Sequence, residues 1–399
     1  MKKIFKYALL FATVYSCSAI LVSCDSDKND DQAQTISEGD QYLQKVLAAD
    51  VDNTINPTYK ALADSCELLY NQLSALKPGD ITQKQVNDVC KTFLNARACY
   101  ERSEAFLLGA AAHFNIDPHI DSWPLDLTAL HTYLTGDVSV SIKDESMLGF
   151  HGIEFILFRD GQPRKASELN GNDTYNEEGQ DFTIFSGKKE LGYAKTVAED
   201  LRNSVFRLQC SWNENAAKAR FDLLEELGKT YVTDKGTSYG INLRNAGDPA
   251  KSTYATIKLA VSSVLTGDNS SGGIADEVGN VKINNPYSGK DVNYIESPYS
   301  YNSLTDFTNN IHSIENIWYG GVAGNRSEYS FSNYFKKYDP ATGARVETAI
   351  MNAIAKIKAI PSPFVKNFKS AKCADAIKAC QEVSDALAAA AKFIVETNK

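Results

Sequence analysis

The segment GFHGIEFILF, residues 149–158, places a histidine and a glutamate inside an otherwise apolar run. His151 and Glu154 are three residues apart, so on a helix both side chains reach the same point beside the axis. Helix-borne metal ligands use this geometry, and carboxylate-bridged di-iron bundles carry the reverse order, Glu-x-x-His. The alternative is a buried histidine whose hydrogen-bond partner is the glutamate. The pair on its own therefore leaves a metal site and a structural pair open.

A second group of polar residues lies upstream, in the segment ARACYERSEAF. Arg97, Glu101 and Glu104 follow one another at spacings of four and three residues, so a helix presents them on one face. The aromatic and aliphatic residues around them indicate that this face is partly buried. A buried carboxylate requires a cation, an arginine or a metal as its partner. If Arg97 and Glu101 instead form an ion pair on the protein surface, they need no metal or further cation. This interpretation also stays open.

The segment NIDPHIDSWPLD, residues 115–126, lies between these two groups and carries several acidic side chains. Its two prolines forbid a continuous helix, so it is predicted to be a loop. Its polar and aromatic members are Asp117, His119, Asp121, Trp123 and Asp126. Carboxylate oxygens from a loop, together with a helix-borne histidine and glutamate, form a metal site of the oxygen–nitrogen type.

The frame H-x-I-E occurs twice in a chain that has five histidines. The second copy is His312–Glu315, inside the segment NIHSIENIWY, and the flanking aliphatic positions also match. One interpretation is an internal duplication with one site-bearing helix in each half, which makes His312 and Glu315 a second site. The other is chance similarity, in which the second helix has only a packing role.

Long segments with helical periodicity, and little strand alternation, must position these residues. Helices are predicted at residues 39–76, 81–114, 127–136, 146–158, 188–231, 251–267, 301–319, 343–359 and 369–397. Thr82, with Gln85 three residues later, is typical of a helix N-terminus. Long loops are predicted at residues 159–184, 233–249 and 268–300, and such loops often border functional sites. The pattern predicts an all-α protein of two antiparallel helical bundles, residues 38–184 and 185–399.

The N-terminal end predicts an envelope location. The basic stretch MKKIFK and the apolar run after it are typical of a secretory signal, residues 1–23. The run ends in LVSC, which resembles the lipobox of bacterial lipoproteins and makes Cys24 the lipidated residue. The acidic residues 24–37 are predicted to be a disordered tether, similar to the surface-export signal of Bacteroidetes lipoproteins. The chain would then be lipid-anchored to the outer membrane, facing the periplasm or the cell exterior. The formal net charge of −9 argues against nucleic acid as a partner.

The segments GFHGIE, ARACYERSEAF and NIDPHIDSWPLD, in one chain after a lipobox, resemble the imelysin-like family, grouped by sequence as peptidase M75. The segment NIHSIENIWYGG resembles a later block of that family. The resemblance implies an all-helical, two-bundle fold with the site where the bundles meet. It also implies a link to bacterial iron acquisition, with proteins of iron uptake as partners. Related members of the family are implied to bind a divalent or ferric metal. The metal ligands implied by residue matching are His151, Glu154, Glu101 and Asp117. The residues expected to line the binding cleft are Arg97, Glu104, Trp123 and Asp126.

The family grouping suggests proteolysis, which the residues themselves support poorly. A zinc peptidase helix carries H-E-x-x-H or H-x-x-E-H, and the second form would require histidine where this chain has Phe155. One histidine with carboxylates suits iron or calcium better than catalytic zinc. Iron is therefore the favoured metal, zinc and calcium are the alternatives, and no catalytic residue is assigned.

Three functions follow from these observations. The first is a non-enzymatic envelope lipoprotein that binds a metal or an iron-bearing ligand. The second is a metallopeptidase with a one-histidine centre. The third is a metal-free helical interaction protein in which the His–Glu pair is structural.

Overall fold

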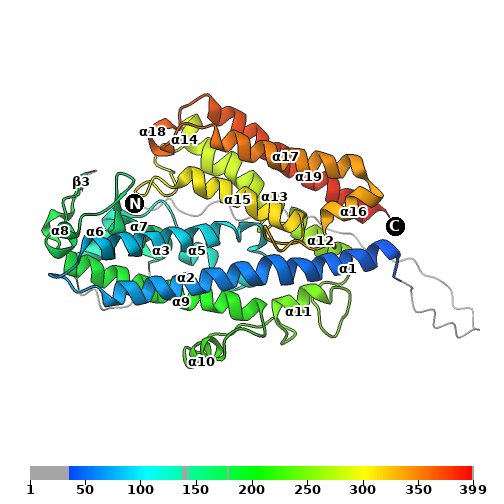
Figure 1. The fold of residues 1–399 in the computed structure, drawn as a ribbon, viewed down its shortest axis with the longest axis horizontal. Coiled ribbons are helices and arrows are strands. Elements are labelled where there is room, and N and C mark those ends of the chain that lie inside the picture. The colour runs from blue at the N-terminus through cyan, green and yellow to red at the C-terminus, as the bar shows by residue number, and fades with distance from the viewer. Residues whose placement is uncertain (1–35, 137–141, 143, 178, 398–399) are drawn as a thin grey trace, which may run out of the picture. The chain divides into compact units, whose positions relative to one another are not determined.

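The folded part of the chain is built almost entirely of helices (Figure 1). The structure, a computed structural model, describes residues 36–136, 142, 144–177 and 179–397. The all-α class predicted from the sequence is confirmed. The predicted signal peptide, the lipidation site Cys24 and most of the predicted tether lie outside the described residues.

The helices vary in length from one turn to seven, and the strands are two short antiparallel pairs. In chain order the α-helices are α1 (Glu38–Asp50), α2 (Asn56–Ala75), α3 (Gln83–Glu101), α4 (Ala110–His113), α5 (Asp117–Ile120), α6 (Leu127–Thr135), α7 (Gly149–Leu157), α8 (Ala166–Asn170), α9 (Gly187–Trp212), α10 (Lys218–Glu226), α11 (Tyr239–Arg244), α12 (Ile257–Thr266), α13 (Ser271–Glu277), α14 (Asn284–Ser288), α15 (Ser303–Trp318), α16 (Phe331–Tyr338), α17 (Pro340–Lys358), α18 (Phe364–Asn367) and α19 (Lys372–Glu396). The strand pairs are β1 (Phe158–Arg159) with β2 (Gln162–Pro163), and β3 (Asn176–Glu177) with β4 (Gln180–Asp181).

The first group of helices is formed by α2, α3, α7 and α9. Helix α2 packs against both α3 and α9, and the short α7 contacts both of those helices in turn. The predicted N-terminus of α3 is confirmed, because the Thr82 side chain accepts the Gln85 amide and the Gln85 side chain accepts the Thr82 amide. This reciprocal capping satisfies two backbone donors that would otherwise lack partners.

The second group is formed by α12, α13, α15, α17 and α19. Helix α19 packs against α12, α13 and α17, while α15 contacts both α13 and α17. Helix α15 also contacts α3, and the turn Glu104–Phe106 that follows α3 contacts both α13 and α15. The two groups therefore meet along α3 and α15. The predicted division at residues 184/185 remains a prediction; in the structure, α9 packs with helices of the N-terminal group.

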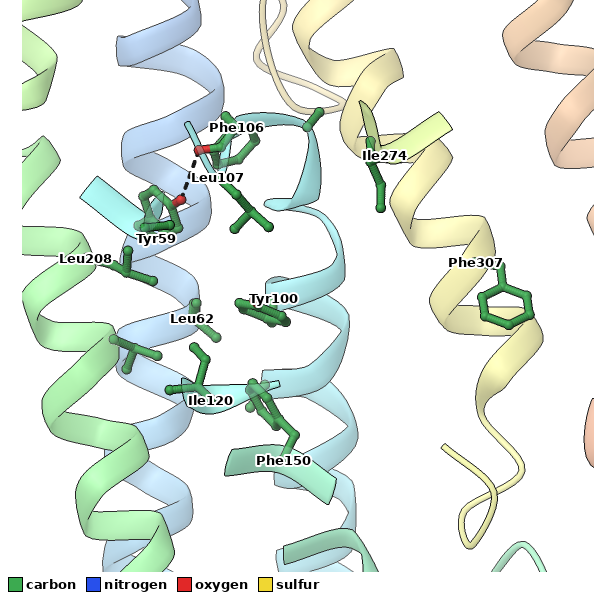
Figure 2. Close-up of a cluster of buried hydrophobic side chains, with 14 of the residues drawn as sticks. Tyr59, Leu62, Tyr100, Phe106, Leu107, Ile120, Phe150, Leu208, Ile274 and Phe307 are labelled. Atoms are coloured by element: carbon green, nitrogen blue, oxygen red, sulfur yellow. Dashed lines mark hydrogen bonds between the residues drawn. The ribbon is translucent and has the colours of Figure 1, made fainter. Parts of the chain in front are cut away.

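Apolar side chains fill the first group up to this junction. Figure 2 shows Tyr59 and Leu62 of α2, Leu208 of α9 and Tyr100 of α3 converging with Phe150 of α7. The rings of Tyr100 and Phe150 lie 5.4 Å apart. Since this core excludes water, polar groups placed against it require partners from the protein or from a ligand.

Two predicted long helices are wrong in length. The helix predicted over residues 81–114 ends at Glu101, because the Ser103 hydroxyl donates to the Tyr100 carbonyl and the chain then turns. The helix predicted over residues 188–231 ends at Trp212, and α10 folds back on it. Arg220 of α10 donates to Asp64 on α2, which holds that return. Tertiary contacts override the local helical preference in both places.

The three predicted long loops contain short helices. Helix α8 interrupts the first loop and α11 the second. Helices α13 and α14 occupy the third, joined by a π-helical segment, Val278–Ile283. The glycines, serines and asparagines of this third segment are typical of loops, but its packing against α19 imposes helix. Helices α5, α16 and α18 were also not predicted, and α5 forms one helical turn within residues 115–126, the segment predicted to be a loop.

Candidate metal centre

The glycines of α7 allow this helix to lie directly against two neighbouring segments. Gly149 has a φ of +72°, and a Cβ there would lie 1.9 Å from the Ile120 carbonyl oxygen. A Cβ on Gly152 would lie 2.1 Å from the hydroxyl of Tyr193 on α9. Only glycine combines the positive φ with such a close approach. Helix α7 is consequently buried along its whole length.

His151 of α7 lies between two carboxylates. Its Nδ1 is 3.2 Å from Oε2 of Glu154, and its Nε2 is 3.2 Å from Oδ1 of Asp121. Burial disfavours the imidazolium, but these carboxylates outweigh burial and raise the pKa of His151 to about 9. The Nδ1 contact is a hydrogen bond, whereas the geometry at Nε2 leaves that nitrogen without a hydrogen-bond partner.

Glu154 is occupied by contacts within the protein. Its Oε1 accepts hydrogen bonds from the Tyr299 amide at 3.2 Å, the Ser300 amide at 2.8 Å and the Ser300 hydroxyl at 2.6 Å. Its Oε2 is the partner of His151. A carboxylate offers about four lone-pair positions, so Glu154 is nearly saturated. Its contacts fix both the imidazole ring and the loop before α15.

Arg97 of α3 is a buried cation surrounded by acids. Its guanidinium pairs with Glu101 at 2.6 Å and lies 3.6 Å from Asp306, and it also contacts Asp121 and Glu296. The guanidinium carbon is 5.3 Å from the centre of a core aromatic ring, that of Phe150. The planar fork of arginine can hold several carboxylates at once, and this ion cluster therefore joins the two groups of helices.

The second group of helices contributes a further cation and three polar partners. The Lys282 ammonium, in the π-helical segment, is 3.2 Å from Oε1 of Glu296. Asp306 of α15 accepts a hydrogen bond from the Ser297 hydroxyl at 2.5 Å. Asn310, one turn further along α15, donates to the backbone carbonyl of Glu101 at 3.3 Å.

Acids outnumber cations in this buried cluster. Six carboxylates are buried there, against two strongly basic side chains, Arg97 and Lys282, and one histidine. The six carboxylates belong to Glu101, Glu104, Asp121, Glu154, Glu296 and Asp306. Burial raises the pKa of Glu101 and of Glu104 well above the ordinary range, and raises that of Asp306 to about 7. Burial also opposes the charge of Asp121, but Arg97 and then His151 lower its pKa to about 2. The cluster therefore stabilises additional positive charge.

Several buried polar atoms of the cluster have no hydrogen-bond partner. These atoms are Nε of Arg97, Oε1 of Glu101, Nε2 of His151, Oε2 of Glu296 and Oδ1 of Asn310. Three of them still lie beside an opposite charge without an aligned hydrogen bond: Glu101 Oε1 is 2.6 Å from the Arg97 guanidinium, His151 Nε2 is 3.2 Å from Asp121, and Arg97 Nε is 3.6 Å from Asp306. Three sets of side chains here bring ligand atoms within 4.8 Å of one another. The sets are Asp121–His151–Glu296, Glu101–Glu296–Asp306 and Glu101–Glu104–Asp121. One nitrogen and several carboxylate oxygens are a donor set suited to iron or calcium.

The structure brings most of the sequence-predicted residues to this cluster. Arg97, Glu101, Glu104, His151 and Glu154 all belong to it. The sixth, Asp117, is half-buried beside the cluster, where it accepts a hydrogen bond from the Tyr100 hydroxyl and burial raises its pKa.

Trp123 lies at the edge of the site, with its ring centre 6.4 Å from that of His151 and 4.1 Å from that of Tyr294. A cavity of about 590 Å³ reaches His151 at this edge, and Tyr299 and Phe368 are among its walls. The site is thus accessible to a small molecule from one side.

The remaining predicted site residues lie elsewhere. Asp126 is exposed and caps α6 by accepting the Ala129 amide at 2.9 Å. His312 and Glu315 pair with each other at 2.7 Å, and Glu315 pairs with Arg326 at 2.7 Å. Neither residue belongs to any of the three sets of ligand atoms among the described residues.

Sequence reasoning missed the partners from the second group of helices. Asp306 and Asn310 are four residues apart on a predicted helix, so their shared face was a usable signal. Lys282 and Glu296 lie in the segment predicted as a loop, and the sequence carries no comparable signal for them. Among the described residues, no helix is both long and apolar enough to cross a membrane.

Comparison with known proteins places this chain in a family. The family model described as Imelysin matches residues 55–391. Iron-regulated protein A of Synechococcus elongatus is 23% identical over 341 residues, which are 84% of this chain and 82% of that protein. A Parabacteroides distasonis protein of solved structure, described as an iron-regulated protein A precursor, is 27% identical with a TM-score of 0.75; the match covers 90% of this chain and 96% of that one.

A more distant solved structure shares the fold alone. It is an imelysin-like protein from Psychrobacter arcticum, 12% identical with a TM-score of 0.51, and the match covers 90% of this chain and 94% of that one. The resemblance noted in the sequence is confirmed by the family model, which spans most of the chain. The chain belongs to the imelysin family.

Proposed function

We propose that this protein is an envelope lipoprotein that binds iron, or an iron-bearing ligand, at the cluster around His151 and serves iron uptake. The iron-related role is supported by the relatives named iron-regulated protein A. Zinc or calcium would be the alternative ions. The leader and Cys24 support the lipid anchor, facing either the periplasm or the exterior.

The observation that carries the proposal is the convergence of unpartnered buried atoms on an acid-rich cluster. An unpaired polar atom in a dry site costs roughly 1–3 kcal/mol, and more when it is charged. A cation bound among Asp121, His151 and Glu296 would replace the proton on Nε2 of His151 and would satisfy Oε2 of Glu296. It would also reduce the repulsion between the surrounding carboxylates.

The ligand set differs in detail from the one implied by family resemblance. We assign Nε2 of His151, Asp121 and Glu296 as first ligands, with Glu101 in reach of the same centre. Glu154 takes a positioning role, because its oxygens are already occupied. In a ligating histidine, the ring nitrogen that does not bind the metal donates a hydrogen bond to such a carboxylate. This bond fixes the orientation of the imidazole and increases the basicity of the ligating nitrogen. Asp117 sits outside the three ligand sets.

Metal analysis tests the proposal. Protein purified without chelator, or reconstituted with ferrous iron under argon and desalted, is expected to retain about one equivalent of metal. His151→Ala and Glu296→Gln should lose it, and His312→Ala, the matched control, should retain it. A wild-type protein that retains no metal would favour the metal-free interaction protein. Chelator-sensitive cleavage of casein that Glu154→Gln abolishes would favour the peptidase.

The lipid anchor has a test of its own. Labelling cells with a palmitate analogue should mark the wild-type protein, and Cys24→Ser should remove both the label and the membrane association. An unlabelled wild-type protein would overturn this part of the proposal.

A further inference from the structure

We propose that the Lys282 ammonium is an internal counter-ion that occupies the acidic centre when no metal is bound, and that metal binding displaces it toward Glu277. This inference rests on the proposed metal-binding function and adds how the site is regulated. The Lys282 side chain is 1% exposed, and its ammonium is 3.2 Å from Oε1 of Glu296. Glu296 is also one of the assigned metal ligands. A metal at that carboxylate and the ammonium therefore compete for the same negative charge.

Lys282 is the cation of the cluster that can leave. Arg97 is held by four carboxylates and by the aromatic ring of Phe150. Lys282 has a hydrogen bond to one of them, Glu296. Its charge is a compact point at the end of a flexible four-carbon stem, whereas the arginine fork is rigid. Burial favours the neutral amine, but Glu296 and then Glu104 outweigh burial and raise the pKa of Lys282, which keeps it cationic.

The backbone provides a second carboxylate for the displaced ammonium. Glu277 immediately precedes the π-helical segment Val278–Ile283, and Lys282 lies within that segment, five residues after Glu277. In a π-helix, hydrogen bonds join residues five apart, so such residues lie one above the other. In an α-helix the same two side chains would diverge by about 140°. Oε1 of Glu277 is already 3.9 Å from the ammonium.

Glu277 lies between the buried centre and a cavity at the protein surface. Its side chain is 46% exposed, and it lines a cavity of about 530 Å³ together with Asp268 and Asp276. Tyr294 borders the same cavity and packs at a tilt of 46° against Trp123, at the edge of the His151 site. A small rotation of the lysine stem would therefore exchange fully buried Glu296 for half-exposed Glu277 at an acidic cavity, where the ammonium is less desolvated.

This exchange makes the site selective for highly charged cations. A tethered ammonium is always present at high effective concentration, so a monovalent ion gains nothing by replacing it. A divalent or trivalent ion adds charge to the centre and outcompetes the lysine. Removing the lysine charge should therefore tighten metal binding, whereas a merely structural lysine would leave affinity unchanged or reduced when removed.

Equilibrium titration with ferrous iron under argon separates these outcomes. Lys282→Met keeps the apolar stem, and we expect it to bind iron at least ten-fold more tightly than the wild type. Lys282→Arg, the matched control, keeps the charge and should bind no more tightly than the wild type. Unchanged or weaker binding by a folded Lys282→Met protein would overturn the inference. If only Lys282→Met binds iron, the counter-ion role stands and the proposed function of the native chain fails. If neither protein binds iron, both fail.

A second measurement uses the wild-type protein and does not depend on the folding of a variant. Amine acylation read by peptide mass spectrometry should label Lys282 slowly in metal-free protein. Labelling should be at least ten-fold faster once iron is bound, because the ammonium then lies beside half-exposed Glu277. Lys60, an exposed lysine of α2, serves as the internal reference. Iron-independent labelling of Lys282 in a protein that binds iron would contradict the displacement.

Discussion

The two H-x-I-E frames of this protein share a local geometry and differ in everything around it. In both, a histidine Nδ1 on a helix hydrogen-bonds the glutamate three residues later, at 3.2 Å on α7 and 2.7 Å on α15. The His151 side chain is 2% exposed, however, and that of His312 is 32% exposed. The i, i+3 pair can therefore form both at the protein surface and in the core.

The difference arises from the elements that face each pair. Around His151, α3, the loop before α6 and the loop before α15 bring further carboxylates, and Nε2 lies beside Asp121 without an aligned hydrogen bond. On α15, Glu315 is paired with a half-exposed arginine, Arg326, so its charge is already matched. The comparison teaches that the motif positions a histidine, and that the junction of the two groups of helices makes the centre.

The largest contrast is expected between the two arginines. Arg97→Met leaves four buried carboxylates without their shared cation, so we expect unfolding free energy to fall by about 3–5 kcal/mol. Arg326→Met removes a largely solvated pair and should cost less than about 1 kcal/mol. Urea denaturation followed by circular dichroism measures both. Similar losses in the two variants would mean that the junction is not the electrostatic centre of the fold.

Metal affinity should distinguish the two histidines next. His151→Ala removes a proposed ligand, and we expect ferrous iron to bind at least about 100-fold more weakly, which exceeds the loss typical of removing a residue that only orients a ligand. His312→Ala should bind as the wild type does. Competition with a chromophoric chelator under argon provides the affinities. Equal affinity in all three proteins would remove His151 from the ligand set.

Substitutions of the two glutamates should produce a smaller difference in iron affinity than substitutions of the two histidines. Glu154→Gln keeps an acceptor for the Tyr299 and Ser300 amides but loses the charge that orients His151. We expect iron affinity to fall by roughly 10–100-fold and exchange of the Ser300 amide with deuterium to accelerate. Glu315→Gln should change neither. Complete loss of iron binding in Glu154→Gln would instead indicate that Glu154 is itself a ligand.

The smallest effect concerns the pH dependence of the α15 pair. The hydrogen bond from His312, and then that from Arg326, lowers the pKa of Glu315 against the opposing effect of burial. This pair therefore contributes stability above the ordinary glutamate pKa, and loses it as pH falls through the lowered folded-state value. Unfolding free energies of wild type and Glu315→Gln should differ by less than about 1 kcal/mol at pH 6 and converge near pH 3. A gap that widens toward acid would reverse the assigned direction.

Much of the fold could be predicted from the sequence, since helical periodicity and the Thr82–Gln85 cap are local signals. The predicted ends of the helices were less accurate, because the turns after Glu101 and Trp212 depend on contacts with distant segments. The short helices after Gly267 were missed, since their composition is that of a loop and packing against α19 imposes their structure.

The half of the centre that lies on α3 and α7 could be predicted, because His151, Glu101 and Arg97 sit at helical spacings in apolar surroundings. The other half could not. Glu296 precedes α15 in an irregular segment, and nothing local indicates that its carboxylate reaches Arg97. The second H-x-I-E frame shows the converse limit, because a matching pattern says nothing about which side chains face it.

Anomalous diffraction from crystals of the wild-type protein grown or soaked with ferrous iron tests the central claim most directly. Data collected on either side of the iron absorption edge should show one peak bounded by Nε2 of His151, Asp121 and Glu296, within about 2.5 Å of the ligand atoms. No peak is expected beside His312 and Glu315. A peak at the α15 pair, or iron bound away from His151, would contradict the account.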